Sequence, residues 1–572
     1  MTAHFMTNRK KITAIQWRIK RELLNNPGNT LSIAITVFFI FAFSFFSILQ
    51  YFSLGDSAYD LGLHAQIIES FLHGKLFYSP LIGESLLAEH FTIFEFFQVP
   101  VYALYQSPLS LLVFQDIFVA AGGYMLYLIS KHLLNKHTKS LLSLEIISVS
   151  FLLVYEISPY TQSLVSFPFH NMAFLPFFFL LATYSFLTER KLFHFFSLAM
   201  IVSLHSNFVY IVAVLLLYEF LFLRTRRGKS IDVWLSSKHN PRGKIQFLYF
   251  IIFVVALYAY VVFAGLMKGY ISGLGFTTLV PGTGAAGAAS DSPVGLIIMF
   301  FTNPNRFFSF ISPNIDLKIF YLTFIFRNTA FLSFLSPLAL IMTLPYLLYA
   351  MPSNYPSYYE LGYQYGSMLS GPVFFGAIIG VCNIALIAQY LKKKVNSHKK
   401  RKEYVSKKTH ALVLRQRAKT YEKNYITIIG IILVLISVAI IPYGIFSPGA
   451  MFQKPGGSAM QNINYLVAGN SSTFLIRESS LMPSNAYILT ENTLMPYFSN
   501  HVNTYSTPWS PGIYGNLSKF TYLVFQYNSF WAITTQSRPP LQTIAMDGLS
   551  NGTYRIIASC PDSEILVLER TS

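Results

Sequence analysis

The chain has 572 residues, of which 53% are hydrophobic and only 12% are charged, and its mean hydropathy is +0.47. A soluble protein of this length has about a quarter of its residues charged. The composition therefore excludes a cytosolic enzyme, a disordered protein and a disulfide-rich secreted scaffold. Only two cysteines are present, Cys382 and Cys560, and they form no Cys-x-x-Cys metal motif. We expect the chain to fold in a lipid bilayer.

The net charge of +18 is concentrated in a few segments. Of the 42 Lys and Arg residues, 31 fall within residues 1–30, 131–191, 224–244 and 392–423. Each segment lies beside long apolar runs, which is typical of cytoplasmic loops under the positive-inside rule. This distribution argues against a nucleic-acid partner and indicates that the basic loop 392–424 contacts anionic membrane lipids.

The apolar runs predict a multi-pass membrane domain over residues 31–446. Residues 31–52 carry no charge and give a helix of about 33 Å, long enough to cross a bilayer as an uncleaved anchor. The polar sequence at 203–207 divides 192–223 into two short helices, and 316–350 forms a hairpin turning at Arg327-Asn328. About eleven spans result, the others being 109–130, 140–157, 164–187, 246–266, 366–391 and 425–446.

An odd number of spans, with the basic N-terminus 1–30 in the cytoplasm, places residues 447–572 outside the cell membrane. Three Asn-x-Ser/Thr sequons lie in this tail, at Asn470, Asn516 and Asn551. Strand patterns occur at 487–490, 503–506 and 521–525, and a hairpin is expected around Pro561-Asp562-Ser563. The expected fold is an all-α polytopic membrane protein with a small extracytoplasmic α/β domain at its C-terminus.

An acidic segment follows the first span. Residues 53–108 contain one basic residue, Lys75, and three histidines. Their six carboxylates belong to Asp56, Asp60, Glu69, Glu84, Glu89 and Glu95. Ionisable groups at a membrane surface indicate a functional site.

Within this segment, Asp56, Asp60 and His64 recur at positions i, i+4 and i+8, which on a helix form one stripe. A carboxylate there can take a proton from an attacking hydroxyl. Alternatively, two carboxylates can hold a divalent cation, Mg²⁺ or Mn²⁺, with His64 or His90 completing the ligand set. A third interpretation is an interfacial amphipathic helix whose carboxylates only face water, and the residues alone leave all three open.

Longer motifs carry a family resemblance. The runs YDLGLHAQIIESFLHGKLFY at 59–78 and AEHFTIFEFFQVPVYALYQSPLSLLVFQ at 88–115 resemble the N-terminal signature of the predicted polytopic membrane proteins called domain of unknown function 2079, DUF2079. FHNM at 169–172, SPLALIMTLPYLLYAM at 336–351, YQYG at 363–366 and the run at 482–508 also fit that family. The residues that match the signature are Asp60, Gln66, His90, Pro100, Tyr102 and Gln115. Ala65 and His205-Ser206-Asn207 depart from the family pattern.

The family is similar in architecture to the membrane-embedded GT-C glycosyltransferases. This resemblance implies transfer of a sugar from a polyprenyl-phosphate donor to an acceptor at the outer membrane face. It implies that Asp60 is the catalytic carboxylate, with Asp56 nearby, and that His64 and His90 orient it or share a metal ion. The expected metal ligands are Asp56, Asp60 and His64. The expected substrate-binding residues are Gln66, Glu89, His170, Arg306 and Tyr365.

Arg306 is preferred for the donor phosphate over Lys75, Lys268 and Lys318, although an arginine that only reaches lipid headgroups gives the same pattern. Two other functions stay open. A secondary transporter would carry matched broken helices, for which 192–223 and 316–350 are the possible pair. The other is a non-catalytic role in the membrane or in surface assembly.

Overall fold

The computed structural model describes residues 26–138, 140–225, 241–273, 293–403, 410–446, 463, 466–513, 517–529 and 540–571. The basic segments 1–25 and 226–240, and the side chains of 392–424, lie outside the described residues. The expected lipid contacts of these segments therefore stay predictions.

Long apolar helices form the membrane domain. By length and hydropathy, five of the described helical segments can cross a membrane: Pro27–Phe52, Pro108–Leu134, Leu248–Ser272, Gln364–Leu391 and Tyr425–Tyr443. They correspond to α2 (Pro27–Phe52), α6 (Pro108–Leu134), and parts of α13 (Pro241–Ser272), α19 (Ser367–Glu403) and α20 (His410–Ile440). A sixth candidate is the pair α7 (Leu141–Ile157) and α8 (Pro159–Ser166), which meet at a bend of 42°. The chain is thus a multi-pass protein, but the expected count of about eleven spans is not confirmed.

Polar breaks explain the difference in span count. Residues 164–187 divide into α8, the 3₁₀ turn η2 (Asn171–Phe174) and α9 (Leu175–Leu187). Residues 192–223 form α10 (Lys191–Leu204), η3 (Ser206–Phe208) and α11 (Val209–Thr225), which are the two short helices expected on either side of a polar break. At both breaks a histidine with extended backbone, His170 or His205, accepts a hydrogen bond from the N–H two residues later. Each histidine thus caps the start of the following 3₁₀ turn, and His205 also directly follows the last residue of α10.

The expected hairpin at 316–350 is also more broken than its hydropathy indicates. Its first helix, α16 (Ile315–Asn328), ends as expected near Arg327-Asn328. Ala330 and Phe331 then adopt left-handed backbone conformations. Four short helices follow: η4 (Leu332–Leu335), α17 (Pro337–Leu340), η5 (Ile341–Thr343) and α18 (Leu344–Ala350). Before α16 lie α14 (Pro293–Thr302) and α15 (Pro304–Ile311).

A mixed five-stranded sheet forms the core of the C-terminal domain. The strand order is β4 (Thr504–Thr507), β3 (Ile488–Glu491), β5 (Tyr522–Gln526), β7 (Ile565–Arg570) and β6 (Tyr554–Cys560). Strands β4, β3 and β5 are parallel, whereas β5, β7 and β6 are antiparallel. Helices α21 (Asn470–Leu481) and α23 (Leu541–Ser550) pack against β6. The strands expected from the sequence, including the hairpin at 561–563, are all present.

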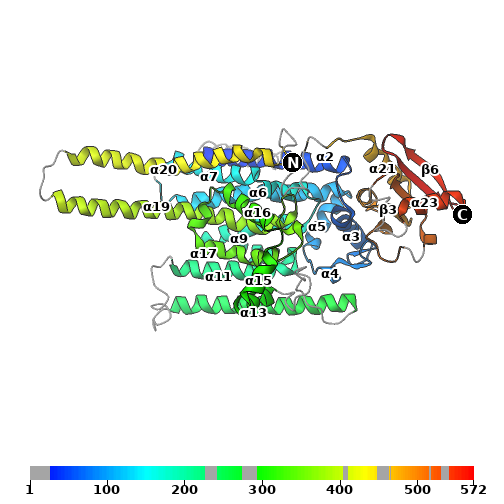
Figure 1. The fold of residues 1–572 in the computed structure, drawn as a ribbon, viewed down its shortest axis with the longest axis horizontal. Helices are drawn as coiled ribbons and strands as arrows, with labels where there is room; N and C mark the ends of the chain where they lie inside the picture. The colour runs from blue at the N-terminus through cyan, green and yellow to red at the C-terminus, as the bar shows by residue number, and fades with distance from the viewer. Residues whose placement is uncertain are drawn as a thin grey trace, which may run out of the picture.

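The two ends of the molecule differ in character (Figure 1). The C-terminal domain lies at one end of the helical bundle, beside α3 (Leu63–Leu72), and α4 (Leu86–Glu89) and α5 (Glu95–Leu104) belong to the same end of the bundle. The hairpin of α19 and α20, which carries the basic sequence 392–424, projects from the opposite end. The acidic segment and the basic loop are therefore separated by the length of the bundle. Which end faces the cytoplasm stays a prediction from the basic residues.

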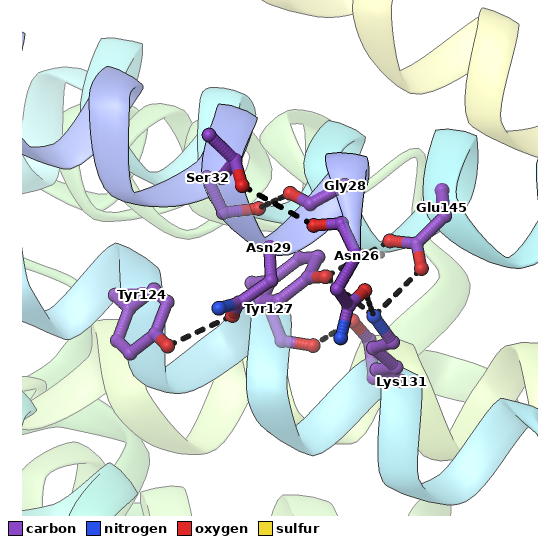
Figure 2. A network of polar contacts seen from close by, with 10 residues as sticks. Asn26, Gly28, Asn29, Ser32, Tyr124, Tyr127, Lys131 and Glu145 are labelled. Atoms are coloured by element: carbon purple, nitrogen blue, oxygen red, sulfur yellow. Dashed lines mark hydrogen bonds and ion pairs between the residues drawn. The ribbon is translucent and has the colours of Figure 1, made fainter. Parts of the chain in front are cut away.

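Near the basic end, a polar network joins α2, α6 and α7 (Figure 2). Lys131 lies 2.6 Å from Glu145 and donates hydrogen bonds to Asn26 and to the hydroxyl of Tyr127. The Tyr127 hydroxyl donates in turn to Glu145, at 2.9 Å. Gly28 makes this contact possible, because a Cβ atom there would lie 1.9 Å from a Glu145 carboxylate oxygen. The network satisfies two opposite charges that the apolar helices largely shield from water.

We expect Lys131→Met to lower the free energy of unfolding by about 1–3 kcal/mol, because Glu145 loses its counter-charge. The thermal midpoint of the purified protein in detergent measures this effect. Lys131→Met combined with Glu145→Gln should recover part of the loss, and Lys136→Met, at an exposed position just after the end of α6, should change little. Equal midpoints for Lys131→Met and Lys136→Met would contradict a stabilising role for the network.

Candidate functional site

Residues 53–62 connect α2 to α3, and we call this segment the acidic turn. It is held by the C-terminal domain. It ends in a π-helical turn, η1 (Ala58–Gly62), which continues into α3. The Ala58 N–H donates to Oδ1 of Asn492 at 3.1 Å, and the Tyr497 hydroxyl donates to the carbonyl of Tyr51 at the end of α2. Gly62 packs so closely on the domain that a Cβ atom would lie 2.3 Å from the sulfur of Met495. Residues more than 400 positions away therefore fix the backbone that carries the first aspartates.

Asp56 and Asp60 lie in different environments within this turn. Asp56 is only 3% exposed, and burial together with the nearby Asp60 carboxylate raises its pKa to about 8. Asp60 is half-buried and accepts a hydrogen bond of 2.6 Å from the Ser57 hydroxyl. Burial raises the pKa of Asp60 to about 6, although Ser57 and the charge of His64 act in the opposite direction. At neutral pH, Asp60 is mostly ionised and Asp56 mostly protonated.

The expected stripe of Asp56, Asp60 and His64 on one helical face is wrong. Asp56 precedes the helix, because the helical backbone begins only at Ala58. The π-helical turn then adds a residue to the first turn, which shifts Asp60 relative to His64. Asp60 still interacts electrostatically with both Asp56 and His64.

A cluster of four histidines lies beyond Asp60. The imidazole rings of His64 and His170 have centroids 5.9 Å apart, and those of His90 and His205 are 5.2 Å apart. The charges of His64, His90 and His205 all act on His170, so the two pairs form one group. We call His64, His90, His170 and His205 the histidine cluster. It joins the acidic segment to the two polar helix breaks that carry His170 and His205.

The orientation of His64 is set by a buried chain of polar side chains. Its Nδ1 lies 3.2 Å from Oε1 of Glu95, which is completely buried. The same oxygen accepts a hydrogen bond of 2.6 Å from the Asn171 amide, and Asn171 accepts one of 2.6 Å from Gln98. A carboxylate that holds one ring nitrogen fixes the imidazole orientation. Glu95 and Asn171 thus position His64 without being exposed themselves.

Among the described residues, Lys268 interacts with the histidine cluster, whereas no such interaction is found for Arg306. Lys268 lies on α13 and acts electrostatically on His90, His205 and Glu84. Arg306 is exposed on α15, where its N–H donates to Asn303, and the described contacts do not link it to the cluster. The preference for Arg306 over Lys268 is therefore not supported. The sequence contains both Lys268 and Arg306, but it does not show whether α13 or α15 approaches the acidic segment.

Two other expected substrate-binding residues, Glu89 and Tyr365, lie near the site. Glu89 accepts a hydrogen bond of 2.7 Å from the Tyr59 hydroxyl and lies 3.6 Å from Nε2 of His90. Tyr365, in η7 (Gln364–Gly366), interacts electrostatically with Asp60 and packs edge-on against Tyr358.

Gln66, also an expected substrate-binding residue, makes hydrogen bonds within the protein, and its role in substrate binding stays a prediction. Its amide donates to the carbonyls of His501 and Thr504, and its carbonyl accepts from Ser79. Because Gln66 is completely buried with both polar ends bonded, it joins α3 to the C-terminal domain.

The residues expected to bind a metal ion do not converge. Among the described residues, no group of three or more His, Cys, Asp or Glu side chains is arranged to hold a metal ion. Asp56 is buried below the turn, Asp60 is bonded to Ser57, and Nδ1 of His64 faces Glu95. The proposed set of Asp56, Asp60 and His64 does not fit Mg²⁺ or Mn²⁺, and no step below uses one.

Four large, exposed apolar side chains lie on α5 or directly after its C-terminal end. They are Phe96, Phe97, Leu104 and Tyr105. Phe and Tyr at the end of a helical bundle are typical of the boundary between lipid and water. The acidic segment 53–108 thus contains, besides its carboxylates, exposed aromatic side chains of the kind found at that boundary.

Comparison with known proteins gives a family match. The family model described as "Predicted membrane protein (DUF2079)" matches residues 50–567. No curated protein matches the chain. ArnT from Cupriavidus metallidurans, solved bound to undecaprenyl phosphate, is 11% identical to this chain, with a TM-score of 0.43. The match covers 95% of this chain and 98% of the ArnT chain. The archaeal oligosaccharyltransferase AglB from Archaeoglobus fulgidus, solved with an inhibitory peptide and a dolichol-phosphate, has 11% identity and a TM-score of 0.32, covering 86% and 69%. Likenesses this weak carry no inference about the reaction.

The contact of Asn492 with the acidic turn gives a test of the site's construction. In Asn492→Leu, the Ala58 N–H loses its acceptor, and amide exchange at residues 58–61 should rise about 10- to 100-fold. Hydrogen-deuterium exchange with mass spectrometry measures this rate. Asn485→Leu, at an exposed position of the same domain, is the matched control. Unchanged exchange in Asn492→Leu would show that the hydrogen bond to Asn492 does not hold the turn.

Proposed function

We propose, from the premise that the chain belongs to the DUF2079 family of predicted membrane proteins, that it is a glycosyltransferase. It moves a sugar from a polyprenyl-phosphate donor to an acceptor hydroxyl at the outer face of the cell membrane. The observation that carries this proposal is Asp60, a half-buried carboxylate of raised pKa that interacts electrostatically with His64 of the histidine cluster.

The location of the site supports a lipid-linked donor. A polyprenyl chain keeps its sugar phosphate at the bilayer surface, so the reacting groups must lie at that depth. The exposed apolar residues of α5 lie in the same segment as the acidic turn. A water-soluble donor would not require this placement.

Asp60 is suited to act as the general base. The acceptor hydroxyl attacks the anomeric carbon, a new carbon–oxygen bond forms, and the bond from that carbon to the phosphate oxygen breaks. The hydroxyl proton passes to Asp60, and the bonding electron pair leaves with the polyprenyl phosphate. A base with a pKa of about 6 is ionised at neutral pH and still basic enough to accept this proton.

The histidine cluster and Lys268 are suited to the departing phosphate. Charge develops on the phosphate oxygens as the sugar leaves, and N–H donors aimed at them lower the barrier. His90, His170 and His205 remain partly or largely exposed, so their ring nitrogens can reach a ligand. Lys268 adds a positive charge on the same side.

Replacing Asp60 tests the assignment of the base. We expect Asp60→Asn in liposomes to lower the transfer rate by about 10²- to 10⁴-fold, because the amide accepts no proton. The assay supplies polyprenyl phosphates carrying radiolabelled glucose, mannose or galactose and detects free polyprenyl phosphate by mass spectrometry. Asp547→Asn, an exposed position on α23, should keep the full rate. Full activity of Asp60→Asn would remove Asp60 from the reaction.

The two aspartates predict a bell-shaped pH profile of kcat/KM. The rate should rise as pH increases through about 6, because Asp60 must lose its proton to act as a base. It should fall above about 8, where Asp56 ionises and adds a second negative charge next to Asp60, which opposes binding of the anionic donor. Asp56→Asn imitates the protonated form, so it should stay active at pH 7 and lose the alkaline limb. A profile that keeps this limb in Asp56→Asn would contradict the role of Asp56.

A buried carboxylate supports secondary transport as a second candidate. Glu156 on α7 is completely buried, and neither of its carboxylate oxygens has a hydrogen-bond partner among the described residues. Such a group within a membrane span is typical of proton or cation pathways. Proton uptake into liposomes that Glu156→Gln abolishes would favour transport, whereas sugar transfer that survives in Glu156→Gln favours the glycosyltransferase.

A further inference from the structure

Two partly exposed aromatic rings, one from each domain, meet beside Asp60. Tyr59 of the acidic turn is 38% exposed and Trp509 of the C-terminal domain is 42% exposed. Their ring centroids are 5.6 Å apart, with the ring planes inclined by 56°. The aromatic pair is neither buried in a core nor separated from the site, since Tyr59 directly precedes Asp60.

Both rings are held in place by hydrogen bonds at their polar ends. The Trp509 indole N–H donates to Oδ1 of Asn492 at 3.1 Å, the same atom that accepts from the Ala58 N–H. The Tyr59 hydroxyl donates to Oε1 of Glu89 at 2.7 Å. The indole and phenol groups are thus tied back to the protein, so each ring can offer its apolar face at little cost in conformational entropy.

The polar surroundings of the aromatic pair are acidic. Glu84, Glu89 and Asp60 all act electrostatically on Tyr59. The second oxygen of Glu89, Oε2, is shielded from solvent and has no hydrogen-bond partner among the described residues. A buried acceptor without a partner is costly unless a ligand supplies a donor.

We propose that Tyr59 and Trp509 form a binding platform for one hexopyranose unit of the substrate. The C–H groups on one face of the sugar stack on the electron-rich faces of the rings, and hydroxyl or ammonium groups on its edge donate to Glu89 and Glu84. The three carboxylates select neutral and amino sugars against uronic acids, because like charges repel. This inference deepens the proposed function and names the class of sugar that the site accepts.

Tryptophan fluorescence of the full chain in nanodiscs tests the platform directly. The sequence has four tryptophans, so replacing Trp17, Trp234 and Trp531 by Phe leaves Trp509 as the only indole. Titration with methyl β-glucoside and methyl β-glucosaminide should give saturable emission shifts in the millimolar range. Methyl β-glucuronide should bind at least about tenfold more weakly.

Variants of Tyr59 distinguish sugar stacking on the rings from other causes of a shift in Trp509 emission. Tyr59→Ala should abolish the saturable response, whereas Tyr59→Phe keeps the ring and should retain it. Circular dichroism confirms that both variants are folded. Equal responses to all three glycosides, no response to any, or a response unaffected by Tyr59→Ala would overturn the platform. The platform would also be overturned if the emission of Trp509 changed only with the lipid composition of the nanodisc. Such a result would show that Trp509 is an aromatic residue at the membrane interface.

The transfer assay keeps this inference distinct from the proposed function. If transfer occurs and Trp509→Leu leaves both KM and kcat unchanged, the platform is wrong and the glycosyltransferase stands. If the glycosides bind saturably but no sugar transfer is found, the platform stands and the glycosyltransferase is wrong. When both are right, Trp509→Leu raises KM about tenfold or more, with a smaller effect on kcat.

Discussion

The attachment of the C-terminal domain to the acidic turn is the contact on which the rest of the site depends. One side-chain oxygen, Oδ1 of Asn492, accepts hydrogen bonds from both the Ala58 backbone and the Trp509 indole. The completely buried Gln66 of α3 makes a second attachment, because its amide donates a hydrogen bond to the carbonyl of Thr504. A short turn between a membrane span and an interfacial helix would otherwise sample many conformations. The docked domain restricts it to the one in which Asp60 lies beside the histidine cluster.

The histidine cluster depends on a different feature, the interruption of membrane helices. His170 and His205 each lie where an apolar helix stops and another starts, and each caps the following turn through its ring nitrogen. Irregular backbone of this kind is tolerated at membrane depth only when protein groups satisfy it. The two breaks bring polar side chains of the α8–α9 and α10–α11 connections close to histidines of the acidic segment. The two histidines that cap the helix breaks are therefore also members of the histidine cluster.

The sequence predicted the parts of this structure that depend on local pattern. Strands β3 to β7 follow from alternation and turn residues, and the helix break at 203–207 follows from five polar-rich positions within an apolar run. The acidic composition and the family resemblance singled out Asp60, His64 and His90, and their roles in a reaction stay a prediction. The stripe of Asp56, Asp60 and His64 failed because a π-helical turn changes the period that such patterns assume. Glu95, Asn492 and Trp509 act through distant contacts, which spacing along one chain does not reveal. The expected GT-C-like architecture stays a prediction.

Lipid and glycan analysis of cells that lack this protein tests the central claim most directly. Mass spectrometry would compare polyprenyl-linked sugars and surface glycans in the deletion strain and in the same strain carrying the wild-type chain. The account predicts that one polyprenyl-phosphate sugar accumulates in the deletion strain while the corresponding sugar is missing from a surface glycan, and that the wild-type chain reverses both. Identical lipid and glycan profiles in the two strains would contradict it.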